Sequence, residues 1–117
     1  MGKLTTHVLD THAGIPAAGV HIELRQLLGT QTQLLGIYVT AQNGRCAGAL
    51  LEDNRFSPGR YELTFHVGEY FRGRGVELSD PAFIEEAVIR IGIADADQHY
   101  HVPLLMTPWS YSVYRGG

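Results

Sequence analysis

The sequence lacks the features that mark membrane proteins, disulfide-rich proteins and nucleic-acid-binding proteins. Its single cysteine, Cys46, cannot form an internal disulfide, and we expect a small buried thiol in a reducing compartment. No run of about 18 apolar residues is available to cross a bilayer, and Met1–Thr6 carries no apolar leader core. A net charge of -3 argues against a nucleic-acid partner. We therefore expect a soluble, cytoplasmic protein that contacts neither membrane nor nucleic acid.

The chain is also short, and its length limits where a site can lie. With 117 residues, of which 44% are hydrophobic, it has the material for one globular domain spanning 1–117 and for no second core. Such a domain is too small to enclose a deep cleft. We expect any large site on its surface or between subunits.

Apolar and polar residues alternate with a period of two in several segments, whereas no helical period is sustained. Turn signals, of which Asn43-Gly44 is the strongest, separate these segments. The pattern predicts an all-β fold, a two-sheet sandwich of seven to eight strands with one short helix at 68–74. The predicted inward faces are the apolar positions of 20–25, 60–67 and 87–93, together with Leu35, Ile37 and Val39.

Histidines occupy two of the predicted strands. His7 lies on the face opposite Leu4, Thr6 and Val8, where a lone histidine is usually structural or merely exposed. His99 and His101 share one face, because residues i and i+2 of a strand point the same way. His-x-His is also half of a common zinc site, so a metal is an alternative. We expect none, since no cysteine pair or His-Glu-x-x-His motif supplies the remaining ligands.

Two further segments could contribute to a site. Arg45 follows the Asn43-Gly44 turn and carries a planar guanidinium fork, which suits a flat, oxygen-rich anion. The alternative is an ordinary solvated turn arginine. Residues 111–117 are rich in aromatic and β-branched side chains, which predicts a docked chain end rather than a frayed one.

Motifs at both ends of the chain resemble those of the transthyretin-like 5-hydroxyisourate hydrolases. Leu4-Thr5-Thr6-His7-Val8-Leu9-Asp10-Thr11, followed by Gly14-Ile15-Pro16-Ala17, is similar to the first signature of that family. His99-Tyr100-His101-Val102-Pro103-Leu104-Leu105 is similar to the second. Tyr114-Arg115-Gly116 resembles the start of the closing Tyr-Arg-Gly-Ser, with Gly117 in place of the serine. The resemblance runs from Leu4 to Gly116.

The resemblance implies an eight-stranded transthyretin-like sandwich assembled as a homotetramer, with active sites in a central channel. It implies hydrolysis of 5-hydroxyisourate to 2-oxo-4-hydroxy-4-carboxy-5-ureidoimidazoline in urate catabolism, by histidine-assisted attack of water and without a cofactor. His7, Arg45 and His101 match the catalytic residues, but which histidine is the base stays open. The chain end would contact the substrate through Tyr114, Arg115, Gly116 and Gly117.

The alternative function is a non-catalytic carrier of small planar ligands. Thyroid-hormone carriers share the fold implied by the resemblance but lack the equivalents of His7, Arg45 and His101, so these residues favour the enzyme. A β-sandwich adhesion or sugar-binding module is a weaker rival, because its fold would not require histidines on the first strand and near the chain end.

Overall fold

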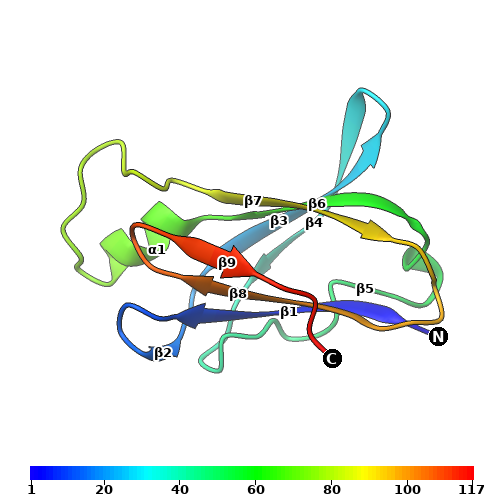
Figure 1. The fold of residues 1–117 in the computed structure, drawn as a ribbon, viewed down its shortest axis with the longest axis horizontal. Coiled ribbons are helices and arrows are strands. Elements are labelled where there is room, and N and C mark those ends of the chain that lie inside the picture. The colour runs from blue at the N-terminus through cyan, green and yellow to red at the C-terminus, as the bar shows by residue number, and fades with distance from the viewer.

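Residues 1–117 fold into two β-sheets packed face to face, with one helix at an end of the sandwich, in the computed structural model (Figure 1). The strands are β1 (Lys3–Asp10), β2 (Ile15–Pro16), β3 (His21–Leu28), β4 (Gln31–Val39), β5 (Leu51–Glu52), β6 (Gly59–Phe65), β7 (Ala87–Ile93), β8 (Tyr100–Met106) and β9 (Tyr111–Val113). The helix α1 (Val67–Gly73) and a short 3-10 turn, η1 (Asp53–Arg55), complete the fold. The predicted all-β sandwich with one short helix is confirmed.

The strands are arranged so that segments from the two ends of the sequence lie side by side. One sheet has the order β2-β1-β8-β9, with β5 also pairing with β1, and the other has the order β4-β3-β6-β7. β1 and β8 run parallel, in register from Leu4 opposite Tyr100 to Asp10 opposite Met106. All other neighbours are antiparallel.

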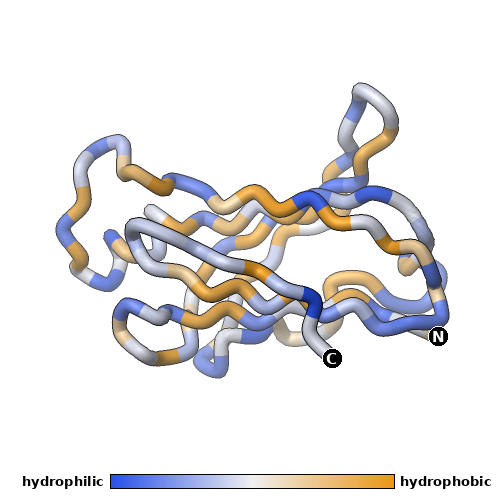
Figure 2. The backbone as a smooth tube through the Cα atoms, viewed as in Figure 1, coloured by the Kyte–Doolittle hydropathy of each residue, from blue (hydrophilic) through white to orange (hydrophobic).

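The core lies between the sheets and follows the predicted alternation on most strands, as the changing hydropathy along each strand shows (Figure 2). Ile89 and Ile91 of β7 are partly buried against the core. The predicted inward residues that are buried are Val20, Ile22, Leu24, Tyr61, Leu63, Phe65, Val67, Ala87 and Ile93.

On β4 the predicted inward face is wrong for two of its three residues. Ile37 is 64% exposed and Val39 is 48% exposed, while Leu35 packs partly against the core. The cause is a β-bulge: the pairing of β3 with β4 skips Leu35, and this extra residue shifts the phase of the strand. Tyr38 takes the inward position instead, and its hydroxyl donates to the carbonyl oxygen of Leu50 at 2.8 Å.

A buried carboxylate ties the end of β1 to α1. Asp10 is 1% exposed, and its two oxygens accept hydrogen bonds at 2.8 Å from the Ala13 amide and from the Tyr70 hydroxyl. Burial, together with this bond to Asp10, raises the pKa of Tyr70 to about 12. The hydroxyl therefore keeps its proton and remains a donor at physiological pH.

The structure also tests the expected burial of Cys46 and the expected lack of a membrane-spanning segment. The thiol of Cys46 is only half-buried, although it packs against the core, and this burial raises its pKa. The longest helix, α1, has 7 residues, and no helix is long and apolar enough to span a bilayer.

Candidate functional site

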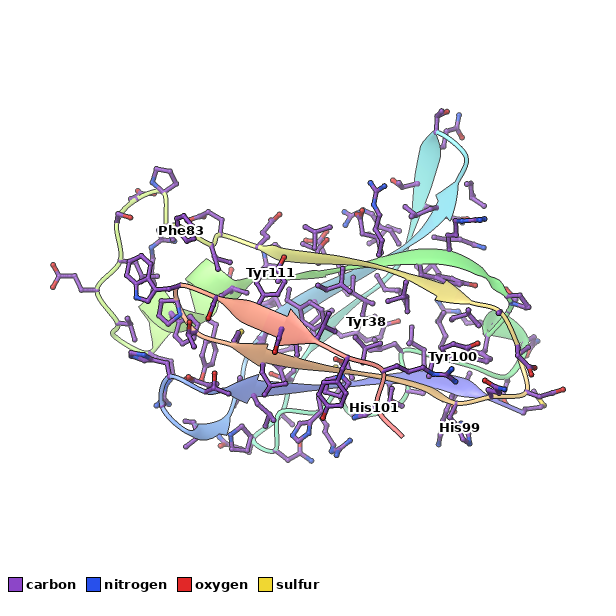
Figure 3. All side chains as sticks on the ribbon, in the orientation of Figure 1. Tyr38, Phe83, His99, Tyr100, His101 and Tyr111 are labelled. Carbon is purple, nitrogen blue, oxygen red and sulfur yellow. The ribbon has the colours of Figure 1, made fainter.

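The outer face of the β1–β8 pair carries most of the candidate residues. Thr5 and His7 alternate on β1 with the buried Leu4, Thr6 and Val8 and therefore face away from the core. The parallel register places His101 opposite Thr5 and Pro103 opposite His7. His99 and His101 project on the side of β8 away from the buried Tyr100 (Figure 3).

Arg45 reaches the same face because its loop pairs with β1. Arg45 and His7 form an isolated antiparallel bridge, and the Val8 amide donates to the carbonyl oxygen of Gly44 at 2.9 Å. The loop turns at Gly44, whose φ of 80° is in the left-handed region. The side-chain oxygen of Asn43 accepts the Arg45 amide at 2.9 Å and holds the turn closed.

A surface cavity of about 320 Å³ opens on this face. Its lining side chains include two fixed cations and two imidazoles, and none of them is acidic or apolar. A cavity with this lining favours a small, oxygen-rich anion over a hydrophobic ligand. The lining residues are Lys3, Thr5, Arg45, His99, His101 and Gly117.

His101 is held in this cavity in a form suited to reaction at neutral pH. Its Nδ1 lies 2.8 Å from the hydroxyl oxygen of Thr5. Burial lowers the pKa of His101, and the charges of Arg45 and His7 lower it further. The imidazole therefore stays uncharged to lower pH than a free histidine would.

His7 lies beside the cavity rather than in its lining, next to Arg45 through their backbone bridge. Its Nε2 is 2.9 Å from the carbonyl oxygen of Asn43, in the same loop. In the parallel register His7 lies two residues beyond Thr5, the residue opposite His101, and both side chains point outward on the same face. The structure thus brings His7, Arg45 and His101 together from three separate segments.

The chain end is docked against this group, as the sequence predicts. The Gly116 amide donates to the carbonyl oxygen of His101 at 2.8 Å, and a Cβ placed on Gly116 would lie 2.6 Å from Cδ2 of the His101 ring. Gly116 therefore lies directly against the imidazole, where no side chain fits. Gly117 continues into the cavity.

Tyr114 and Arg115 point elsewhere. Both line a second cavity, of about 440 Å³, between β7 and the β8–β9 pair. The Arg115 guanidinium lies 4.0 Å from the centre of the Tyr100 ring and donates to the Gln98 side chain at 3.0 Å and to the carbonyl oxygen of His99 at 3.1 Å. These contacts turn Arg115 away from the imidazoles.

Sequence reasoning missed Lys3 and Thr5 as cavity residues. The signal was present, because both alternate with His7 and must share its outward face. For His99 the sequence pattern indicates only half of a metal site. No group of three His, Cys, Asp or Glu side chains is placed to hold a metal ion, so His99 and His101 find no further protein ligand in this chain.

The fold and this face define a β-sandwich protein with a polar, cationic cavity on the outer surface of one sheet. The chain belongs to the HIUase/Transthyretin family, whose model matches residues 4–116. A 5-hydroxyisourate hydrolase from Pseudomonas aeruginosa is 52% identical over 116 residues, which cover 99% of this chain and 92% of that protein. The 5-hydroxyisourate hydrolase 2 of Rhizobium meliloti is 55% identical over 115 residues, covering 98% and 96%.

Comparison with solved structures also finds proteins of this fold. The 5-hydroxyisourate hydrolase of Klebsiella pneumoniae superposes with a TM-score of 0.82 at 33% identity and covers 100% of both chains. An (S)-allantoin synthase superposes with a TM-score of 0.93 at 44% identity; the match covers 99% of this chain but spans only 44% of that one. Sea bream transthyretin in complex with thyroxine has a TM-score of 0.87 at 24% identity, covers 97% and 94% of the two chains, and is similar in fold alone.

Proposed function

We propose that this chain, as a single domain over residues 1–117, hydrolyses 5-hydroxyisourate to 2-oxo-4-hydroxy-4-carboxy-5-ureidoimidazoline in urate catabolism. The observation that carries the proposal is the gathering of His7, Arg45 and His101 around one small cationic cavity. The hydrolase relatives, which match over nearly the whole chain, support the same substrate.

The proposed reaction uses the three side chains without a metal or organic cofactor. Water attacks a ring carbonyl of the substrate, so that a carbon–oxygen bond forms while a histidine accepts the water's proton. The ring carbon–nitrogen bond then breaks and the departing nitrogen receives that proton. A placed acid-base group of this kind contributes about 10²- to 10⁴-fold to the rate.

Arg45 supplies the electrostatic part of the proposal. Its guanidinium binds the substrate's oxygens and stabilises the negative charge that develops on the attacked carbonyl. The lowered pKa of His101 keeps that imidazole neutral near pH 7 beside the cation. Gly117, which lines the cavity, offers the substrate backbone rather than side-chain contacts, while Gly116 packs against His101 and Tyr114 and Arg115 stabilise the docked chain end.

We further propose that the protein works as a cytoplasmic homotetramer. The cavity is open to solvent on the outer face of a sheet, and β7 and β9 are edge strands, each paired on one side only within this chain. Pairing of such edges between copies would cover them, and facing dimers would close the cavities into a channel. A mass of about four times 12.9 kDa in ultracentrifugation is expected. An active monomer would contradict the shared channel.

The decisive experiment follows the ultraviolet absorbance of freshly made 5-hydroxyisourate. The wild-type chain should accelerate its loss, and His7→Ala, Arg45→Ala and His101→Ala should each lower kcat/KM by roughly 100-fold or more while leaving the fold intact. His12→Ala, which removes an exposed imidazole outside the cavity, is the matched control. A folded triple variant with wild-type turnover would refute the assignment.

Two outcomes of the same assay discriminate the alternatives. Saturable binding of planar ligands with no turnover would identify a carrier instead of an enzyme. Extended treatment with a chelator should leave the rate unchanged. If the chelator abolished turnover and added zinc restored it, the reaction would depend on a metal ion bound at His99 and His101, and the proposed metal-free chemistry would be wrong.

A further inference from the structure

Lys3 and His99 line the same cavity as Arg45 and His101, but the proposed hydrolysis gives neither of them a role. Lys3 is the only lysine of the chain. On β1 it shares the outward face of Thr5, because residues two apart on a strand point the same way. His99 immediately precedes β8 and projects on the same side as His101 (Figure 3). Both side chains thus extend the polar face of the site.

The register of β1 separates the two fixed cations of the cavity. Arg45 lies opposite His7 in their backbone bridge, whereas Lys3 precedes His7 by four residues on the strand. At roughly 3.3 Å per residue, four residues correspond to about 13 Å of strand. The side chains of Lys3 and Arg45 can therefore approach a bound planar bicycle from its opposite ends.

The backbone around Lys3 and His99 is held by several contacts. The Gly2 amide donates to the carbonyl oxygen of Ala96 at 2.9 Å, and a Cβ placed on Gly2 would overlap the carbonyl oxygen of Gln98. The Arg115 guanidinium donates to the carbonyl oxygen of His99 at 3.1 Å. The start of the chain is therefore packed against the turn that leads into β8, and the backbone of His99 is engaged while its imidazole faces the cavity.

The two cations of the cavity have no acidic partner. Neither Lys3 nor Arg45 forms an ion pair, although acidic residues outnumber lysine and arginine by 12 to 9 in the chain. Glu52 pairs with Lys3 between β5 and β1, but its side chain is exposed and forms no ion pair with the ammonium group. Two uncompensated cations raise the electrostatic potential of one cavity, and an anionic ligand would supply the missing charge.

We propose that Lys3 and His99 form a second anion subsite, which binds the end of the substrate opposite to the carbonyl on which Arg45 and His101 act. Lys3 supplies a fixed charge and His99 supplies an N–H donor, and both suit the oxygens of an oxidised purine ring. The subsite binds and orients the substrate but takes no part in bond breaking. This inference rests on the proposed hydrolysis.

Removal of the Lys3 charge should weaken binding and leave the chemical step alone. Lys3→Gln should raise KM roughly three- to tenfold and change kcat by less than about twofold, since one charge-assisted contact at a solvent-exposed site is worth a factor of this size. Lys3→Arg should restore KM. Arg60→Gln is the matched control, because it causes the same change in net charge at an exposed position on the other sheet. Wild-type KM in a folded, active Lys3→Gln protein would overturn the subsite.

His99 is tested by removing its ring and by replacing its donor. His99→Ala should raise KM roughly two- to fivefold, and His99→Gln should raise it less because the amide keeps an N–H group. Equal KM values for His99→Ala and the wild type would remove His99 from the subsite.

The single lysine allows the charge to be tested by chemical modification of the unmutated chain. Acetylation removes the ammonium charge, whereas reductive dimethylation keeps it. The acetylated protein should show the raised KM of Lys3→Gln, and the dimethylated protein should stay close to the wild-type KM. The terminal amine of Met1 also reacts, so the same treatments of Lys3→Gln measure its separate effect. Equal KM values for the acetylated and dimethylated chains would contradict a role for the charge.

Urate, a planar and oxygen-rich purine anion, is a probe that needs no turnover. In isothermal titration calorimetry the dissociation constant of urate should be roughly three- to tenfold higher for Lys3→Gln, and should depend less on salt concentration than in the wild type. Lys3-dependent binding of urate by a chain that does not turn over 5-hydroxyisourate would refute the hydrolysis and support the subsite. Turnover with a KM and a urate affinity that are independent of Lys3 would refute the subsite and support the hydrolysis.

Discussion

Arg45 lies opposite His7 in a backbone bridge, so the loop that carries the site's central cation also serves as a neighbouring strand of β1. On this side β1 has no long partner. It is covered in pieces, by β5 at Lys3 and Leu4, by the Arg45 loop at His7, and by β2 at Leu9 and Asp10. The position of the guanidinium thus depends on a short loop, and that loop depends on one glycine.

Gly44→Ala should weaken both the fold and the site. The new methyl group would overlap the carbonyl oxygen of Val8, and alanine at a φ of 80° is strained by about 1–2 kcal/mol before any overlap. We expect a lower free energy of unfolding and a lower kcat/KM, measured by denaturant titration and the absorbance assay. Gly29→Ala is the control, since Gly29 has a φ of 65° with nothing near its Cβ position. Equal losses in the two variants would show that the contact with β1 is unimportant.

Gly116→Ala should act on His101 from the other side. The added Cβ would lie 2.6 Å from the imidazole Cδ2 and 3.3 Å from Cγ of Pro103, so the ring or the chain end must move. Displacement of a positioned imidazole should lower kcat/KM by roughly tenfold or more. Gly48→Ala, where a Cβ meets nothing within 4 Å, provides the comparison. Wild-type turnover by Gly116→Ala would remove the chain end from the site.

Gly117→Ser should improve turnover. Gly117 lines the cavity and a Cβ placed on it meets nothing within 4 Å, so a serine side chain has room. A hydroxyl that bonds to substrate or water is worth about 0.5–1.5 kcal/mol, which corresponds to an increase in kcat/KM of up to roughly tenfold. The rates of the two chains are compared at equal protein concentration. Identical rates would show that a hydroxyl at this position is dispensable.

Tyr70→Phe should destabilise the protein without touching the site. It leaves one oxygen of the buried Asp10 carboxylate without its donor, which costs about 1–3 kcal/mol of unfolding free energy. Urea denaturation measures this loss, and kcat/KM of the folded variant should stay at the wild-type value. Tyr111→Phe removes an exposed hydroxyl and should cost little. A Tyr70→Phe protein as stable as the wild type would show that Asp10 finds another donor.

The protein should lose stability as pH falls below about 6.5, in part because of His101. Burial, then the charges of Arg45 and His7, lower the pKa of His101 in the folded state from its ordinary value of 6.5. In the window just below 6.5 the unfolded chain therefore binds more protons than the folded one, and the unfolding free energy rises with pH. His101→Gln should flatten this dependence between about pH 5 and pH 7 in denaturant titrations. An unchanged slope would contradict the lowered pKa.

Local patterns predicted the outward face of the site well. A period of two is a property of the strand itself. Alternation alone therefore places His7 on the face of β1 that points away from the buried Leu4 and Val8. In the same way it places His101 on the face of β8 that points away from the buried Tyr100 and Val102. The same reasoning applied once more would have added Lys3 and Thr5 to the cavity.

The errors arise where distant segments decide the outcome. The exposure of Ile37 and Val39 follows from a bulge in the pairing with β3, and nothing in residues 35–39 alone signals it. The direction of Arg115 likewise depends on the Tyr100 ring and the Gln98 side chain. These contacts are set by tertiary structure, which periodicity cannot report.

The parallel pairing of β1 with β8 has a consequence for how the protein is made. Thr5 and His101 are 96 positions apart, so their contact belongs to the high-contact-order pairings that form late and slow the folding of β proteins. On the ribosome, β1 has only its two-residue pairings with β2 and β5 and the loop contact at Arg45 until β8 has been synthesised. A nascent chain therefore exposes the edge of β1 for most of its synthesis. A chain truncated before residue 100 lacks β8 and cannot form the site at all.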